Sequence, residues 1–198
     1  MAGLLDVIKA RRSFYQIGTN TDKNADDVVA ALRAVISSVP SAVNSQSSRL
    51  VVVTGEKHVQ LWNMIEETQR GALSKEMFKR FAPRFTLAKK GLGTILFFEE
   101  RQAVEDMPLN ESRQELYKHE NHAFATYAAW LALQDLGLGA SLQHYNIGYE
   151  QGFDKEIREF LDLPAGWEML AQMPFGSIDA EADDKPRLDP TQRVIKIS

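Results

Sequence analysis

The sequence predicts a layered fold, α/β or α+β, in which helices pack against a central sheet. Short runs of β-branched, aromatic and aliphatic residues, typical of buried strands, recur along the chain, and longer stretches with helical periodicity separate them. The chain has 198 residues, 44% of them hydrophobic, which is enough to bury one full core. No internal repeat or flexible linker divides it, so we expect a single domain over residues 1–198.

Six segments have the pattern of helices. Asn24 can cap the second of them, and Asp26 and Asp27 place negative charge at the positive end of its dipole. Pro83 should interrupt the fourth, because proline has no N–H to donate. Gly137 ends the longest one. The expected helices cover residues 4–11, 24–39, 59–69, 75–89, 111–136 and 153–161.

Four segments have the pattern of strands. The first covers residues 50–54, where the run LVVVT is continuous and β-branched and Gly55 follows it. The second covers residues 94–100, TILFFEE. The third, GASLQHY at residues 139–145, is short and begins with glycine, and the fourth, WEMLAQMPFGSI, covers residues 167–178. A polar tail closes the chain.

Charge and composition exclude several classes of function. The net charge is −4, so we expect no general affinity for nucleic acid. The absence of cysteine excludes thiolate catalysis, disulfides and cysteine-based zinc or iron–sulfur sites. No apolar stretch is long enough for a signal peptide or a membrane span, so we expect a cytoplasmic protein without a membrane partner.

The familiar catalytic motifs are absent from the sequence. It contains no GxSxG, HExxH, GxGxxG or Walker pattern. His119 and His122 lie three residues apart on the longest expected helix, and Glu115 lies one turn before them. An exposed helix face explains these residues more simply than a metal does, because zinc and iron sites take further ligands from a distant element. We therefore predict no metal site and keep a histidine–metal protein as an alternative.

Three polar segments have the chemistry to bind a cofactor. Arg11-Arg12-Ser13 follows the first helix, and Lys185 and Arg187 project to one side of an extended tail, as suits a phosphate. The segment SAVNSQSSR, residues 41–49, offers two side-chain amides and four hydroxyls, which can pair with the donor and acceptor edge of a flat heterocycle. Each segment taken alone is explained more simply as a solvated helix end, tail or loop.

Together these segments occur in a recognisable order, which is RRS, PSAVNSQSSR, LGLGASLQHY and KPR. In this order and spacing the chain resembles the flavin-dependent nitroreductase family over nearly its whole length. NSQSSR and GTILFFEE are most similar to the subgroup of the fungal fatty-acid-repression nitroreductases and their bacterial relatives. The resemblance implies an α+β three-layer sandwich, with a mostly antiparallel sheet flanked by helices, in an intertwined homodimer. A C-terminal extension, about residues 180–198, would reach the partner subunit.

The resemblance also implies residues that bind flavin mononucleotide (FMN). The flavin phosphate would be contacted by Arg11, Arg12 and Ser13 and by the basic pair Lys185 and Arg187. The loop that reaches the other subunit's flavin would contribute Pro40, Ser41, Ala42, Asn44 and Gln46. Gln143, His144 and Tyr145 form the segment that would pass over the flavin ring, which we call the ring segment. A backbone amide of this segment would donate to flavin N5.

This chain departs from the family pattern at two places. Tyr15 stands where many relatives have a basic residue, and His144 brings a titratable imidazole near the ring as a possible modulator of the chemistry. No residue between positions 70 and 95 is assigned a ring contact.

The function implied by the resemblance is a flavin-dependent oxidoreductase. It would pass two electrons from NADH or NADPH to nitroaromatics, quinones or similar electron-poor acceptors by a ping-pong mechanism, with the chemistry on the flavin and no catalytic side chain. The main alternative is a flavin-binding regulatory protein, acting in lipid or stress signalling, with little turnover. A cofactor-free structural domain is a further alternative.

Overall fold

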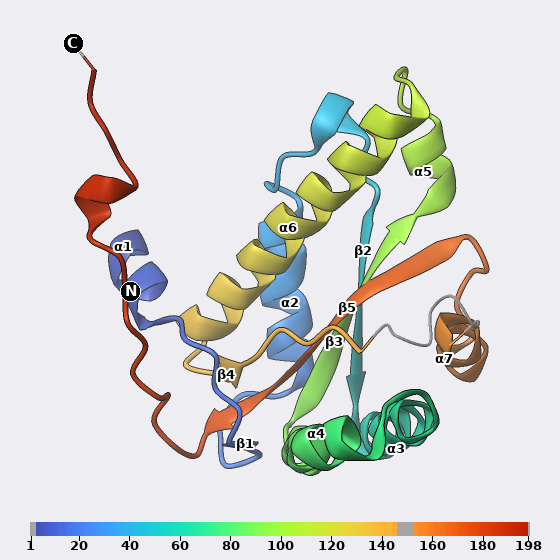
Figure 1. Ribbon diagram of the computed structural model, residues 1–198, viewed down its shortest axis with the longest axis vertical. Helices are drawn as coiled ribbons and strands as arrows, with labels where there is room; N and C mark the ends of the chain where they lie inside the picture. Colours follow the sequence, from blue (N-terminus) through green and yellow to red (C-terminus); the bar gives the residue numbers. More distant parts are fainter. Residues whose placement is uncertain (1–2, 146–152, 198) are drawn as a thin grey trace.

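The computed structural model describes residues 3–145 and 153–197 (Figure 1). Its centre is a five-stranded sheet in the order β1-β5-β3-β2, with β4 also paired to β5. The strands are β1 (Ile17–Gly18), β2 (Ser48–Thr54), β3 (Gly93–Glu100), β4 (Gly139–Ala140) and β5 (Trp167–Ile178). Every strand pair is antiparallel, which confirms the sheet implied by the resemblance.

Helices cover both faces of this sheet. Along β3, Ile95 and Phe97 pack on one face with α2 (Ala25–Ile36) and α6 (Glu111–Asp135). Leu96 and Phe98 pack on the other face with three helices, α3 (Gly55–Ala72), α4 (Lys75–Ala88) and α7 (Phe153–Leu161). Because both faces are covered, β3 has no solvent face, and its apolar run is therefore continuous. The three-layer α+β sandwich is confirmed (Figure 1).

The helix ends follow the capping residues in the sequence. The Asn24 side chain accepts hydrogen bonds from the backbone of Asp26 at 2.8 Å and Asp27 at 3.1 Å, and the Asp27 carboxylate accepts from the Asn24 backbone at 2.9 Å. This capping box begins α2 where it was predicted. Gly137, with φ of +76°, follows the end of α6. The shorter elements are α1 (Leu4–Ala10), α5 (Arg101–Glu105) and 3-10 turns at Ala42–Asn44 and Pro190–Gln192.

The predicted interruption at Pro83 is wrong, because α4 is one helix of 14 residues that runs through it. Proline costs the bond that its N–H would make to the carbonyl of residue 79, but it does not force a break. Phe85 is fully buried in the core, and Phe78 and Phe81 pack against that core from the same helix. This tertiary packing outweighs the local cost of the proline.

The predicted third strand is mostly wrong, because only Gly139 and Ala140 of residues 139–145 form a strand. The Ser141 backbone donates to the Pro174 carbonyl at 3.3 Å, but Pro174 has no N–H to return. The ladder therefore stops there, and a single bridge between Gln143 and Gln172 continues the pairing.

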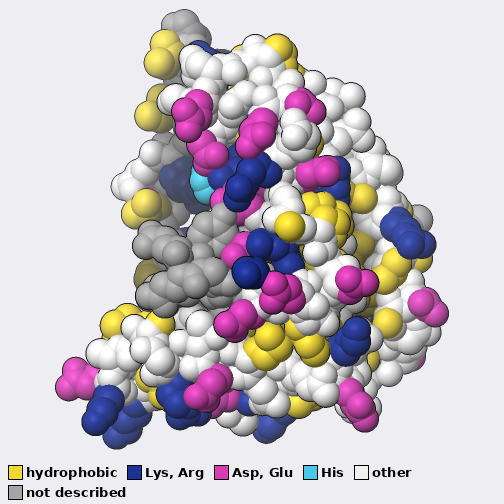
Figure 2. All heavy atoms as spheres, turned by 90° about the vertical axis from the view of Figure 1, so that its right-hand side faces the viewer, with side chains coloured by type: hydrophobic (Ala, Val, Ile, Leu, Met, Phe, Trp, Pro, Cys, Tyr) yellow, Lys and Arg dark blue, Asp and Glu magenta, His cyan; other side chains and the backbone are white. Residues whose placement is uncertain are grey.

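The surface is mixed in charge on the face shown in Figure 2, where Lys and Arg side chains lie among Asp and Glu side chains. This face therefore offers no continuous basic surface for a polyanion. Among the helices of the described residues, none has the length and hydropathy of a membrane span.

Candidate functional site

A first pocket joins the Arg11-Arg12-Ser13 segment to the C-terminal tail. Arg12, Ser13 and Lys185 line a pocket of about 150 Å³, and the Arg12 guanidinium donates to the carbonyl of Asp183. Two segments more than 170 residues apart thus place two cations and a hydroxyl around one space. This is the donor set that a phosphate requires. Acidic side chains of Glu181 and Asp183 line it as well, and they would have to turn away from a bound anion.

Two predicted phosphate ligands lie outside this pocket. The guanidinium of Arg11 lies over the Trp130 ring, 4.3 Å from its centroid. Its Nε is buried and has no hydrogen-bond partner within the described part of the chain, so it keeps a donor for a ligand. Arg187 is exposed on the tail and does not line the pocket. The structure therefore brings Arg12, Ser13 and Lys185 together and leaves Arg11 and Arg187 apart from them.

The predicted ring segment lies beside the first pocket. Ser13 forms a bridge with Ala140, and the Phe14 backbone donates to the Ala140 carbonyl at 3.0 Å. Strand β5 then holds residues 143–145, because Gln143 exchanges two backbone hydrogen bonds with Gln172, of 2.7 and 3.0 Å. Contiguous backbone thus leads from the phosphate donors to the segment expected over the flavin ring.

The backbone amides of the ring segment differ in what they bind. Gln143 donates to the Gln172 carbonyl, and Tyr145 donates to the Gln172 side-chain oxygen at 2.9 Å. The amide of His144, between them, has no acceptor among the described residues. Of the three predicted ring residues, His144 therefore carries the amide that is available to a ligand.

A second pocket, which we call the ring pocket, is bounded by this segment and has a volume of about 330 Å³. Three of its lining residues are almost fully buried, Gln69 with 1%, Gln143 with 7% and Tyr145 with 8% exposure. The Gln69 Nε2 atom has no hydrogen-bond partner among the described residues, and the Tyr145 hydroxyl has only the nearby Arg84 guanidinium, outside normal hydrogen-bond geometry. Such atoms normally have one, so these two mark a place for a ligand. The full lining is Gln69, Leu73, Met77, Phe81, Arg84, Leu142, Gln143, His144 and Tyr145.

The ring pocket is lined in part by residues of the range 70–95, in which the sequence assigned no ring contact. Four of its residues come from this range, and Arg84 is the charged one. The Arg84 guanidinium lies over the ring of Tyr15, 4.6 Å from its centroid. Arg84 thus brings a cation next to Tyr15, the residue at which this chain departs from the resemblance. Sequence reasoning missed it, because no local signal links positions 15 and 84.

Burial shifts the two titratable groups of the ring segment in predictable directions. It lowers the pKa of His144, which favours a neutral imidazole. It raises the pKa of the Tyr145 hydroxyl to about 12, although nearby Arg84 opposes that shift. Tyr145 therefore stays a neutral hydrogen-bond donor at physiological pH.

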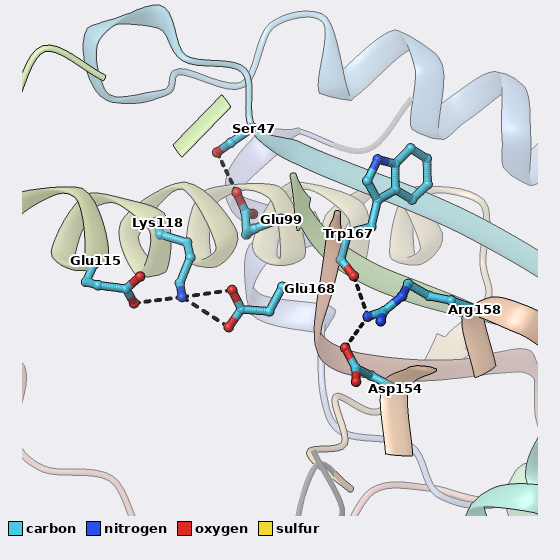
Figure 3. A network of polar contacts seen from close by, with 8 residues as sticks. All are labelled: Ser47, Glu99, Glu115, Lys118, Asp154, Arg158, Trp167 and Glu168. Atoms are coloured by element: carbon cyan, nitrogen blue, oxygen red, sulfur yellow. Dashed lines mark hydrogen bonds and ion pairs between the residues drawn. The ribbon is translucent and has the colours of Figure 1, made fainter. Parts of the chain in front are cut away.

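The segment of residues 41–49 is held by bonds within the chain. Asn121 on α6 accepts from the Ala42 backbone at 2.8 Å and donates to the hydroxyls of Ser45 at 3.0 Å and Ser47 at 3.1 Å. Ser47 donates onward to the carboxylate of Glu99 (Figure 3). Ser48 donates to the other oxygen of that carboxylate at 2.6 Å. The serines thus anchor the loop to its own subunit.

The same loop presents its two amides to solvent. Asn44 and Gln46 are exposed, and their φ angles of +57° and +47° lie in the left-handed region, as does that of Val43 at +47°. A β-branched valine is strained there, and such strain is typical of functional loops. Pro40, Ser41 and Gln46 line a third pocket of about 230 Å³.

The loop and β4, after which the ring segment begins, lie at opposite ends of α6. Figure 1 places the Ala42–Asn44 turn at the upper end of α6 and β4 at its lower end. None of the residues that line the loop pocket also lines the ring pocket. That the loop reaches another subunit's flavin stays a prediction.

Buried charges lie beneath the loop. Burial raises the pKa of Glu99 to about 7, and the hydrogen bonds from Ser47 and Ser48 and the charges of Lys118 and Arg49 oppose this shift only in part. Lys118 is paired with Glu115 at 2.7 Å and with Glu168 at 3.1 Å (Figure 3).

The histidine pair on α6 shows no metal geometry. His122 packs edge-on against Phe97, with ring centroids 6.0 Å apart. Its pKa falls to about 4, because of burial and the neighbouring His144 and His119. Glu115 is engaged by Lys118. Within residues 3–145 and 153–197, no three His, Asp or Glu side chains are grouped to hold a metal ion.

Comparison with known proteins identifies the family of the chain. The model of the nitroreductase family matches residues 8–177. FRM2, a nitroreductase of Saccharomyces cerevisiae, is 26% identical over 193 residues, covering 91% of each chain, in agreement with the fungal subgroup.

Solved structures are similar over the full length. Nitroreductase CinD from Lactococcus lactis, in complex with chloramphenicol, is 30% identical with a TM-score of 0.85, covering 99% of this chain and 100% of its own. A Desulfovibrio desulfuricans protein solved with FMN is 20% identical with a TM-score of 0.72, covering 100% of this chain and 98% of its own, and it shares the fold. The chain belongs to the nitroreductase family.

Proposed function

We propose that this protein is an FMN-dependent oxidoreductase that passes two electrons from NADH or NADPH to an electron-poor aromatic or quinone acceptor. The observation that carries the proposal is that direct contacts link the segments that line the two pockets. The Ser13–Ala140 bridge joins the phosphate donors Arg12 and Ser13 to the segment that carries the free His144 amide. Arg84, which lines the ring pocket, lies over Tyr15, which lines the phosphate pocket.

The residues present fit FMN. Arg12, Ser13 and Lys185 would hold the phosphate, and the buried Nε of Arg11 would add a donor. The backbone amide of His144 would donate to flavin N5, and its neutral imidazole would lie beside the ring. Family membership and the FMN complex of the Desulfovibrio protein support this choice of cofactor.

Bound FMN would supply the two-electron chemistry. In the net reaction, NAD(P)H and a proton reduce a nitro group to a nitroso group, yielding NAD(P)⁺ and one water. The protein's part is to orient the reactants and to donate hydrogen bonds to developing negative charge. CinD has been solved with 4-nitrophenol, a nitroaromatic, which supports this class of acceptor.

We propose further that the active form is a homodimer. Apolar side chains remain exposed on α1, at Leu4 (70%) and Leu5 (66%), and on α6, at Phe124 (48%) and Tyr127 (43%). An apolar groove of about 540 Å³ lies between α1, α2 and α6. The tail, about residues 180–198, leaves the sheet past α1 and would reach the partner subunit (Figure 1). Exposed apolar surface of this kind is typical of an interface.

The phosphate site can be tested by titrating FMN with the purified protein and following the quenching of its fluorescence. Arg12→Gln and Lys185→Gln should each weaken FMN binding about tenfold or more, because each removes a charge-assisted hydrogen bond. Lys79→Gln, an exposed cation on α4 outside this pocket, is the matched control and should bind FMN normally. Wild-type affinity in both pocket variants would contradict the assignment.

A further inference from the structure

We propose that the tail segment of residues 181–185, which we call the strap, is an autoinhibitory contact on the phosphate pocket. Its carboxylates occupy the space that a phosphate would take, and they have to leave before the cofactor can bind. This inference rests on the proposed function, because it concerns how the FMN site is filled. It predicts that removing the carboxylates strengthens cofactor binding.

The charges that line the phosphate pocket cancel. Arg12 and Lys185 contribute two positive charges, and Glu181 and Asp183 contribute two negative charges. The pocket has a volume of only about 150 Å³, so a phosphate inside it would lie within a few ångströms of both carboxylates and be repelled by them. The other lining residues are uncharged, namely Ser13, Tyr15, Gln16, Leu87 and Ala182.

The strap is only lightly attached to the rest of the chain. It begins just after Asp179, whose backbone donates to the Gln16 carbonyl at 3.1 Å. Beyond Asp179, the one hydrogen bond from the described part of the tail to the rest of the chain is that between the Arg12 guanidinium and the Asp183 carbonyl (Figure 1). Residues 181–189 form neither helix nor strand. A segment held in this way can leave its site at low cost.

The same bond engages a group that would bind the phosphate. Because the Arg12 guanidinium donates to the strap, a phosphate that takes this donor also releases the strap. Neither carboxylate of the strap forms an ion pair with Arg12 or Lys185 among the described residues, so no such pair would have to break.

Release of the strap would also bring in the missing basic residue. Glu181, Asp183, Lys185 and Arg187 are spaced by two, so in an extended chain their side chains project to one side. In this structure the two acids and Lys185 line the pocket, whereas Arg187 lies outside it. When the acids turn to solvent, the basic pair can close on the phosphate together. The strap thus accounts for the position of Arg187, which the resemblance assigned to the phosphate.

The test is a titration of the purified protein with FMN and, separately, with riboflavin, which lacks the phosphate. Glu181→Gln and Asp183→Asn should each strengthen FMN binding about threefold, because each removes a repelling charge and keeps the size of the side chain. Riboflavin affinity should not change in either variant. A partly unfolded variant cannot imitate this result, since it would lose affinity.

Asp184→Asn is the matched control, because Asp184 is an exposed carboxylate of the strap that does not line the pocket. It should change FMN affinity less than either pocket variant does. The titrations are made at an ionic strength of about 0.15 M, where exposed charges more than about 8 Å apart are largely screened.

Inorganic phosphate separates this inference from the proposed function. Calorimetry should show that the double variant Glu181→Gln and Asp183→Asn binds phosphate more tightly than wild type. A protein that follows this pattern, yet takes up no FMN or oxidises neither NADH nor NADPH, would overturn the proposed function and support the strap. FMN affinity unchanged in both pocket variants, a gain equal to that of Asp184→Asn, or an equal gain for riboflavin would overturn the strap and leave the oxidoreductase standing.

Discussion

At the scale of single residues, the polar loop at positions 41–49 divides into two sets of side chains. Ser45, Ser47 and Ser48 bond to Asn121 and Glu99 within the chain. Asn44 and Gln46 stay exposed on strained backbone. The hydroxyls therefore fix the shape of the loop. The two exposed amides bond to each other, Gln46 donating to Asn44 at 3.3 Å, and we expect them to meet a ligand.

The first prediction concerns the side chain that anchors this loop. Asn121→Ala should lower the free energy of unfolding by about 2–3 kcal/mol, because it leaves the buried Ser47 hydroxyl and the Ala42 amide without their partner. It should also weaken FMN binding, since the loop is proposed to meet a cofactor. Urea unfolding and FMN titration measure the two effects. Glu120→Ala, exposed on the same helix, is the control, and an effect equal to the control would contradict the anchoring role.

The second prediction concerns the buried carboxyl of Glu99, whose pKa rises from 4.5 to about 7 on folding. Between these values the folded state binds more protons than the unfolded state, so this group's contribution to stability is full below pH 4.5 and is lost as the pH rises to 7. Glu99→Gln removes that dependence. The difference in unfolding free energy, variant minus wild type, should therefore rise with pH by about 3 kcal/mol across this window.

Urea unfolding at several pH values between 5 and 8 measures that difference. Glu105→Gln, an exposed carboxylate on α5, should follow wild type at every pH. A difference between Glu99→Gln and wild type that stays constant with pH would show that Glu99 titrates normally. The lowered pKa of His122 makes the unfolding free energy rise with pH, opposite to the effect of Glu99. The difference between Glu99→Gln and wild type cancels the contribution of His122, so it is more informative than the wild-type pH dependence alone.

At the scale of elements, the parts predicted best from sequence are those with a strong local signal. The apolar run of β3 and the Asn24 cap of α2 were both read correctly, because burial on two faces and a capping box leave direct traces in sequence. The strand expected at residues 139–145 failed, since its length depends on Pro174 in another strand. The contact between Arg84 and Tyr15 was not predicted either, because it also joins residues that lie far apart in the sequence.

The candidate site, like the secondary structure, could be predicted from the sequence only in part. The resemblance predicted that Arg12, Ser13 and Lys185 lie together, and the fold brings them to one pocket, while their role in binding a phosphate stays a prediction. Gln69 was not singled out, because a glutamine on a helix carries no sign that its amide is buried without a partner. Such features depend on packing between elements that lie far apart in sequence.

The third prediction concerns α4. Pro83→Ala should raise the free energy of unfolding by about 1–2 kcal/mol, because it restores a helical hydrogen bond, while the more flexible unfolded chain offsets part of the gain. Pro83 is exposed, so no core contact is lost. Thermal or urea unfolding measures the change, with Thr86→Ala, also exposed on α4, as a control for helix propensity alone. A loss of stability would mean that the proline shapes the helix.

At the scale of the whole molecule, the exposed apolar residues of α1 and α6 lead to the fourth prediction. The double variant Phe124→Ser and Tyr127→Ser should shift the protein from dimer to monomer and reduce its FMN content, because the loop is proposed to reach the partner's cofactor. Light scattering coupled to size exclusion gives the mass, and absorbance gives the flavin. The control is Val59→Ser, an exposed apolar residue on α3.

Such a dimer would couple assembly and stability, so the unfolding midpoint of wild type should rise with protein concentration. A wild-type protein that is monomeric at every concentration, yet binds FMN stoichiometrically, would contradict the shared site. It would leave the phosphate and ring pockets of each chain to hold the cofactor alone.

The most direct test of the central claim is the visible absorption spectrum of the purified protein with FMN, recorded without oxygen before and after NADH or NADPH is added. Flavin bands that disappear with one of these donors, and return when 4-nitrobenzoate is added, are the predicted result. A protein that takes up no FMN would contradict the cofactor assignment. Flavin bands that persist with both donors would contradict the oxidoreductase and favour a flavin-binding protein without turnover.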